Sequence, residues 1–268
     1  MEIEWVLAFV SLGLFAGFMA GLLGIGGGGI MVPILTSIFL AQGIAPQYVV
    51  HLALGTSMAS IVMTSISSTR AHHARGGVLW PIVKAMAPGV VLGTFSATFL
   101  AARISSLYLA IFFALFMGYV ALNMLRPKKA VIAQKKDISN TELVAVGGGI
   151  GAISALVSIG GGSLTVPYLN SRNIELKRAI GTSAAVGLPI SAAGAIGYLI
   201  NSQPQLELPF AVGMVYLPGV ILISIASFFT APLGAKLAHK LPVAILKKVF
   251  AVLLILLSVK MMWSVIYA

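Results

Sequence analysis

The sequence has very little charge for its length. Only 9% of the 268 residues are charged, 59% are hydrophobic, and the mean hydropathy is +1.04. A soluble domain normally carries charge on about a quarter of its residues to cover its surface. The composition therefore predicts a multi-pass membrane protein with length for about eight spans of roughly 20 residues and no separate soluble domain.

Acidic residues are especially scarce, and none is expected at membrane depth. The six are Glu2, Glu4, Asp137, Glu142, Glu175 and Glu207, and all lie at a terminus or between apolar runs. Cation transporters and carboxylate proton relays usually need an acidic group inside the membrane. The distribution therefore argues against both, and it excludes a paired-aspartate intramembrane protease.

Cysteine is absent altogether, so disulfides and thiolate metal sites are excluded. The run Gly24–Gly29 fits the glycine spacing of dinucleotide-binding loops. It lacks the preceding strand and the acidic residue about 20 positions later that this motif requires. A Gly-Lys-Ser or Gly-Lys-Thr phosphate loop is also missing. We therefore expect no cofactor, no metal site and no nucleotide-driven transport by this chain.

The two halves of the chain repeat each other. The matching segments are Ile25–Leu35 with Ile159–Leu169, Gly55–Ser57 with Gly181–Ser183, and Pro88–Val90 with Pro218–Val220. Three matches in the same order argue against chance similarity between apolar segments. We therefore divide the chain into a first transmembrane repeat (1–126), a cytoplasmic basic linker (127–141) and a second transmembrane repeat (142–268).

The basic residues predict the topology. All but Arg103 and Lys260 fall in four clusters: Arg70, Arg75 and Lys84; Arg126, Lys128, Lys129, Lys135 and Lys136; Arg172, Lys177 and Arg178; and Lys236, Lys240, Lys247 and Lys248. The positive-inside rule places all four on the cytoplasmic side. Only the glycine-interrupted segment 143–170 separates the second cluster from the third. That segment must therefore leave and return on one side, as a re-entrant hairpin or as two crossings.

By the repeat, residues 5–41 should also leave and return on one side of the membrane. Each half then contains a broken or re-entrant helix pair followed by three transmembrane helices, and the odd number of full crossings inverts the second half. The predicted fold is an all-α membrane protein built from two inverted-topology repeats. Both termini are predicted to be extracytoplasmic.

Glycine breaks supply the candidate site. The runs Gly24–Gly29 and Ser158–Ser163 lie inside apolar segments, where each glycine costs a helix about 1 kcal/mol relative to alanine. Broken backbone at membrane depth survives only where protein buries it or where it lines a polar cavity. The helix that restarts after each break presents unpaired amides and a positive dipole end, which suit an anion. The alternative is that these glycines only allow close helix packing.

Hydroxyl side chains extend this candidate site. The pairs Thr56–Ser57 and Thr182–Ser183 follow the two breaks at matching positions, and Thr64, Ser65 and Ser191 add further hydroxyls. A hydroxyl can donate to an oxyanion without the cost of a buried charge, although it also commonly bonds to its own helix. The predicted substrate-binding residues are Gly26, Gly27, Gly28, Gly29, Thr56, Ser57, Ser158, Gly160, Gly161, Gly162, Ser163, Thr182 and Ser183. No catalytic residue or metal ligand is predicted.

The glycine runs leading into Val32-Pro33 and Val166-Pro167, with the paired Gly-Thr-Ser segments, resemble the TauE/SafE family of sulfite exporters over essentially the whole chain. The resemblance implies a permease of the cytoplasmic (inner) membrane that carries a small sulfur-containing anion such as sulfite, a sulfonate, sulfoacetate or thiosulfate. One departure is Ser158, which stands where the first repeat has Gly24. The resemblance leaves the individual substrate and the direction of transport open.

The leading hypothesis is a secondary transporter that works by alternating access, with the anion held between the two breaks. An anion channel would share this site but should conduct without saturation or counterflow. An intramembrane hydrolase would need a serine and a histidine together, and the pair Ser57 and His51 falls on opposed faces of one helix. The expected partners are the anion and the lipid bilayer, with no nucleic acid, and a homodimer is compatible on general grounds.

Overall fold

The computed structural model describes residues 2–24, 26–125, 138–201, 208–238, 240 and 243–266. The helices are α1 Ile3–Leu23, α2 Gly28–Ala41, α3 Pro46–His73, α4 Trp80–Ala101, α5 Ser106–Leu125, α6 Asn140–Val157, α7 Gly162–Ser171, α8 Leu176–Ile200, α9 Leu217–Ala238 and α10 Val243–Ile266. The strands β1 Ala211–Val212 and β2 Val215–Tyr216 form a short antiparallel hairpin before α9. Residues 127–137, which make up most of the predicted linker, lie outside the described residues.

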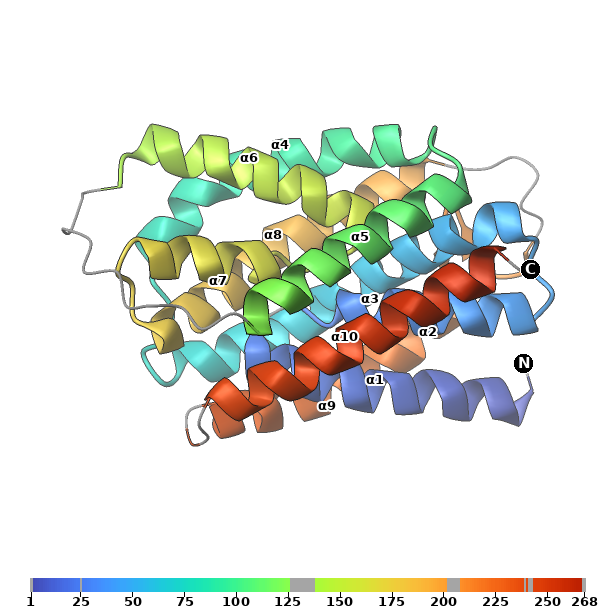
Figure 1. The fold of residues 1–268 in the computed structure, drawn as a ribbon, viewed down its shortest axis with the longest axis horizontal. Helices are drawn as coiled ribbons and strands as arrows, with labels where there is room; N and C mark the ends of the chain where they lie inside the picture. Colours follow the sequence, from blue (N-terminus) through green and yellow to red (C-terminus); the bar gives the residue numbers. More distant parts are fainter. Residues whose placement is uncertain are drawn as a thin grey trace.

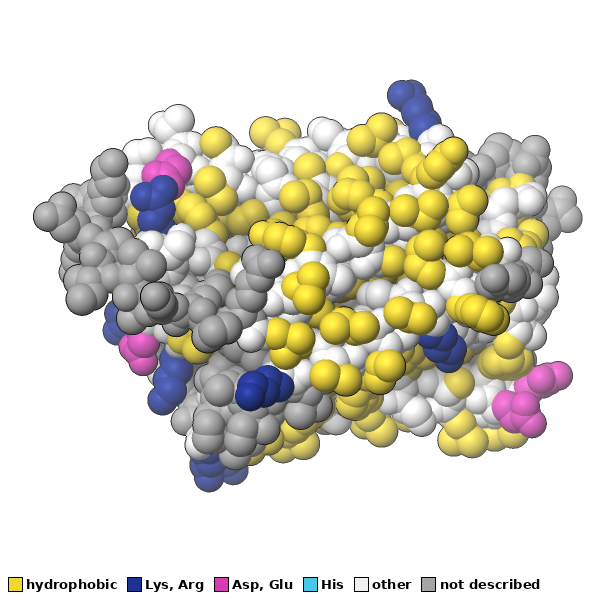
Figure 2. All heavy atoms as spheres, in the orientation of Figure 1, with side chains coloured by type: hydrophobic (Ala, Val, Ile, Leu, Met, Phe, Trp, Pro, Cys, Tyr) yellow, Lys and Arg dark blue, Asp and Glu magenta, His cyan; other side chains and the backbone are white. Residues whose placement is uncertain are grey.

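Seven helices within the described ranges are long and apolar enough to cross a membrane: α1, α3, α4, α5, α6, α8 and α9. Large apolar side chains such as Leu92, Leu115 and Phe229 point outward and are about two-thirds exposed. Figure 2 shows apolar side chains covering the middle of one face, with charged side chains toward the ends. This is the surface that a lipid-facing helix bundle needs. The prediction of an all-α multi-pass membrane protein is confirmed.

The two broken helix pairs enter the bundle from opposite ends. Helix α1 runs inward from the end that holds both termini, and α2 returns to that end (Figure 1). Helices α6 and α7 do the same from the opposite end (Figure 1). At 1.5 Å per residue, the 14 residues of α2 and the 10 of α7 are about 21 and 15 Å long, too short to cross a hydrocarbon core of about 30 Å.

The long helices α3 and α8 form the centre of the bundle, and they are the most enclosed of the spanning helices. They pack against each other, α9 packs on α3, and α4 packs on α8. Two further pairs correspond between the halves, since α1 packs on α9 and α6 packs on α4. These corresponding pairs agree with a repeat, and its inverted two-fold relationship stays a prediction.

Close helix crossings explain many of the remaining glycines. A Cβ on Gly89 of α4 would lie 2.0 Å from the Val144 carbonyl oxygen of α6, and one on Gly21 of α1 would lie 1.9 Å from the Ala231 carbonyl oxygen of α9. Small residues let membrane helices approach this closely. Because lipid gives no hydrophobic driving force for helix association, the close packing of the helix backbones holds such helices together. The packing interpretation of glycine therefore holds at these crossings.

The chain ends and the loops are sorted between the two ends of the bundle. Both termini lie at one end, and the α3–α4 and α7–α8 connections lie at the other (Figure 1). Figure 2 shows Lys and Arg side chains mostly gathered at the end opposite the acidic residues near the N-terminus. This sorting agrees with the charge pattern used to predict topology. The orientation in the membrane stays a prediction.

Candidate functional site

Both predicted helix breaks are present. Helix α1 ends at Leu23, Gly24 is left-handed at φ 67°, and α2 begins after Gly27 at φ 83°. In the second half, α6 ends at Val157 and α7 begins after Gly161 at φ 77°. Left-handed backbone is nearly free for glycine and costly for other residues. The glycines are therefore required by the backbone path at these two points.

Ser158 takes the left-handed conformation without being glycine. Its φ of 48° and ψ of 44° match the position of Gly24 in the first break. Its buried hydroxyl donates to the Leu54 carbonyl oxygen of α3 at 3.2 Å. A non-glycine residue in this region stores strain of order 1–3 kcal/mol, which the surrounding contacts must hold. This hydrogen bond holds the second break against α3.

The two breaks lie directly against each other. A Cβ on Gly26 would be 2.7 Å from the Cα of Gly160, and a Cβ on Gly28 would be 1.5 Å from the carbonyl oxygen of Ser158. Neither distance is possible for a real side chain. The structure therefore brings the two predicted half-sites together, and any side chain at Gly26 or Gly28 would push them apart.

A narrow hollow lies beside this junction, with about 190 Å³ of space between atoms and no room for a water molecule. Its walls come from α1, α3, α8 and the two breaks, and its lining residues are Ala20, Gly24, Gly26, Thr64, Ser65, Ser68, Gly160 and Ala184. The hollow is therefore closed in this conformation, and the two breaks would have to separate from α3 or α8 to admit an ion.

Only Gly26 and Gly160 of the predicted residues line the hollow. Gly28 and Ser158 meet at the junction, and the Ser183 hydroxyl donates to the Gly24 carbonyl oxygen at 3.1 Å or to that of Ile180 at 2.8 Å. The others face elsewhere: Gly27 contacts Ala16 and Met31, Gly29 contacts Leu254 and Met117, Gly161 contacts Ile190, and Ser57 donates to the Met31 sulfur. Gly162 and Ser163 begin α7 outside the lining.

Thr56 and Thr182 make equivalent bonds in the two halves. The Thr56 hydroxyl accepts the amide of Tyr216 at 3.0 Å, immediately before α9. The Thr182 hydroxyl accepts the amide of Leu79 at 3.0 Å, immediately before α4. Each therefore satisfies an amide at the start of a spanning helix that has no intrahelical partner. Their duplication in the sequence has a structural explanation.

The hydroxyl face of α3 contributes three lining residues, of which Thr64 and Ser65 were expected from the sequence as further hydroxyls and Ser68 was not. Thr64 bonds to the Ser60 carbonyl oxygen and to the Ser227 hydroxyl of α9 at 2.7 Å, and Ser67 donates to the Phe228 carbonyl oxygen. Ser68 is 2% exposed, and its hydroxyl has no hydrogen-bond partner among the described residues. Since Ser68 also lines the hollow, an unsatisfied donor lies beside the two breaks. The sequence signal was the four-residue spacing of Ser60, Thr64 and Ser68 on one helix.

The lining of the hollow is electrically neutral. No charged side chain is among its lining residues in the described part of the chain. The titratable residue one turn beyond Ser68 on α3 is His72, whose Nε2 lies 3.0 Å from the Gly21 carbonyl oxygen. The groups that the hollow can offer an ion are therefore backbone dipoles and hydroxyls. No group of three or more potential metal ligands occurs in the described ranges.

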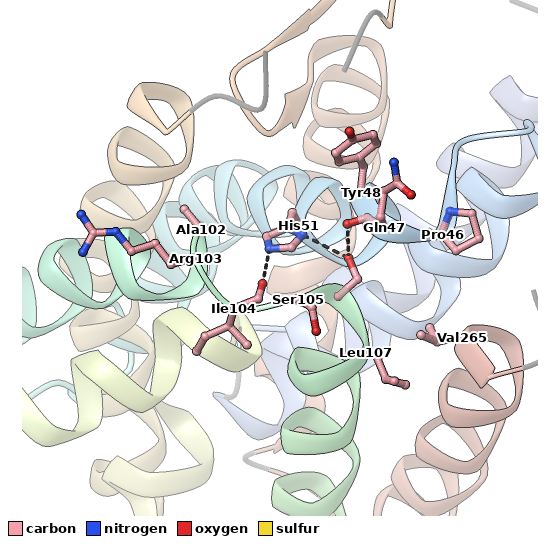
Figure 3. A pocket seen from close by; sticks show the side chains of 11 residues that line it. Pro46, Gln47, Tyr48, His51, Ala102, Arg103, Ile104, Ser105, Leu107 and Val265 are labelled. Carbon is pink, nitrogen blue, oxygen red and sulfur yellow. Dashed lines mark hydrogen bonds between the residues drawn. The ribbon is translucent and has the colours of Figure 1, made fainter. Parts of the chain in front are cut away.

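A larger pocket of about 520 Å³ opens at the end that holds the termini (Figure 3). Its lining includes His51, Arg103 and Ser106. The His51 Nε2 lies 2.9 Å from the Ile104 carbonyl oxygen, its Nδ1 lies 3.1 Å from the Ser106 hydroxyl, and the Arg103 side chain points away from the ring (Figure 3). His51 thus binds the α4–α5 turn to α3. Its bonded partners do not include Ser57, so the hydrolase pairing is not formed.

Broken helices that meet inside a bundle of membrane-spanning helices are typical of membrane transport proteins. Residues 9–261 match the family described as Sulfite exporter TauE/SafE. The chain belongs to that family and is a membrane transporter. No solved structure matches it.

Several relatives are described as probable membrane transporter proteins. A probable membrane transporter protein of Haemophilus influenzae is 38% identical over 96% of this chain and 98% of its own length. The probable membrane transporter protein YdhB of Bacillus subtilis is 26% identical over 86% of this chain and 89% of its own. The probable membrane transporter protein MJ0441 of Methanocaldococcus jannaschii is 28% identical over 90% of both chains.

Proposed function

We propose that this protein is a secondary transporter that moves a small sulfur-containing anion, such as sulfite, a sulfonate or thiosulfate, across the cytoplasmic membrane. The family name supports a sulfur oxyanion. The observation that carries the proposal is the meeting of two helix breaks at a closed hollow whose wall holds an unsatisfied hydroxyl. Backbone dipoles and hydroxyls stabilise an anion without a buried cation.

Alternating access would expose the site to one side at a time. Each broken pair is anchored at a different end of the bundle, and the two breaks meet at the glycine junction (Figure 1). Rocking of one pair against the other would open the hollow toward one end while the opposite pair keeps it closed. Both termini would be extracytoplasmic. The membrane potential or a proton gradient would supply the energy for moving the anion across the membrane.

Counterflow in proteoliposomes tests this function. Purified protein is reconstituted with unlabelled sulfite inside, and the transient accumulation of labelled sulfite, thiosulfate and several sulfonates is measured against empty liposomes. The proposal predicts saturable accumulation of at least one of these anions. Flux that neither saturates nor shows counterflow would indicate a channel, and no protein-dependent flux of any of them would contradict the proposal.

A further inference from the structure

The residues that line the hollow between the breaks are all neutral. Its lining consists of three glycines, two alanines and the hydroxyl residues Thr64, Ser65 and Ser68. The basic residues near α3 and α8, including Arg70, Lys177 and Arg178, belong to the ends of the bundle and do not line it. A cation that could neutralise a bound ion is therefore missing from its described walls.

Donors are nevertheless available in this hollow. The Ser68 hydroxyl is buried with no hydrogen-bond partner among the described residues, although buried hydroxyls are normally bonded. The neighbouring Thr64 hydroxyl already bonds to Ser227, and Ser183 donates to backbone carbonyl oxygens. Ser68 is therefore a side-chain donor that a ligand in the hollow would satisfy without breaking a bond seen in the structure.

The charge of the ligand decides whether such a site can hold it. The electrostatic cost of moving an ion from water into a weakly polar site rises with the square of its charge, so a dianion costs about four times as much as a monoanion of the same size. A paired cation normally offsets this cost, and dipoles and hydroxyls offset only part of it. On the basis of these neutral walls, we propose that the transporter carries oxyanions in their singly charged form and discriminates against doubly charged ones.

This inference rests on the proposed function and narrows its substrate class. Methanesulfonate and other sulfonates without a second acidic group carry a single charge at neutral pH, as does hydrogensulfite. Sulfoacetate, the sulfite dianion, thiosulfate and sulfate carry two. Ser68 would donate to an oxygen of the monoanion, and the dipoles at the breaks would face its remaining charge. The titratable group nearest along α3, His72, is held at the Gly21 carbonyl oxygen outside the lining and supplies no direct contact.

A comparison of two fixed-charge anions tests the inference. Reconstituted protein loaded with sulfite at neutral pH is offered labelled methanesulfonate or labelled sulfate at equal concentration, and exchange is measured. We expect methanesulfonate to exchange at least about tenfold faster than sulfate. Exchange of sulfate at a rate equal to or above that of methanesulfonate would overturn the inference, while sulfite exchange in the same vesicles would leave the transport function intact. Absence of exchange with all three anions would overturn both.

The Ser68→Ala variant tests the donor. Its matched control is Ser224→Ala on α9, because Ser224 is also buried without a described hydrogen-bond partner but does not line the hollow. We expect Ser68→Ala to raise the half-saturating methanesulfonate concentration by at least about tenfold, as expected for one lost hydrogen bond to a charged group. Ser224→Ala should leave it unchanged. Equal values for Ser68→Ala and the unmodified protein would remove Ser68 from the site.

Discussion

A Cβ on Gly26 would lie only 2.7 Å from the Cα of Gly160, which leaves no room for a side chain there. These residues belong to different halves of the chain and to breaks that enter the bundle from opposite ends (Figure 1). Their contact joins the two broken helix pairs into one site. The same contact limits what the first break can tolerate, because a side chain at Gly26 or Gly28 would push the two breaks apart.

Thr56 and Thr182 should matter for stability more than an ordinary helix hydroxyl. Replacing either by valine leaves the amide of Tyr216 or Leu79 buried without its acceptor, at a cost of about 1–3 kcal/mol. Thermal unfolding in detergent should show a lower midpoint for Thr56→Val and for Thr182→Val. Thr36→Val is the control, since within the described part of the chain the Thr36 hydroxyl bonds to the Val32 carbonyl oxygen of its own helix. An equal loss in all three variants would contradict the assigned role.

Ser158 should distinguish backbone strain from hydrogen bonding. Ser158→Ala keeps the left-handed strain and loses the bond to the Leu54 carbonyl oxygen, so we expect a loss of about 1 kcal/mol. Ser158→Gly loses the same bond but relieves the strain, so its stability should remain close to that of the unmodified protein. Unfolding midpoints of the two variants give the comparison. A glycine variant less stable than the alanine variant would show that the strain is not present.

His51 should stabilise the fold without contributing to transport specificity. His51→Ala removes bonds to the α4–α5 turn at Ile104 and Ser106, and we expect about 1–3 kcal/mol of destabilisation. The half-saturating substrate concentration of the folded fraction should not change, because His51 does not line the hollow between the breaks. A changed substrate preference at unchanged stability would show that the larger pocket takes part in recognition.

The breaks could be predicted from sequence because their cause is local. Several glycines in succession cannot be accommodated cheaply within a helix, and the structure places left-handed residues at Gly24, Gly26 and Gly27 as that reasoning requires. The same reasoning applies at Gly161. Ser158 follows only from the repeat, since a serine by itself gives no signal for left-handed backbone.

The place of Ser68 in the α3 wall could not be predicted in the same way, whereas Thr64 and Ser65 were among the hydroxyls expected near the site. Hydroxyl residues occur around much of α3 between Thr56 and Thr69, so no single apolar face reveals its orientation. Ser67 reaches the Phe228 carbonyl oxygen on α9, while the adjacent Ser68, about 100° further round the helix, lines the hollow. The difference is set by how α3 packs against α8 and α9. Thr56 and Thr182 show the converse. Their repeated positions predicted substrate binding, but their hydroxyls accept backbone amides at the starts of α9 and α4.

The most direct measurement compares sulfite counterflow by Gly26→Ala and Gly149→Ala. A Cβ at Gly26 must displace the second break, whereas one at Gly149 in α6 meets nothing within 4 Å. Both proteins are first shown by helix content and size to be folded. We predict at least about a tenfold loss of counterflow for Gly26→Ala and less than about a twofold change for Gly149→Ala. Folded Gly26→Ala protein that exchanges sulfite at the unmodified rate would contradict a transport site at the meeting of the two breaks.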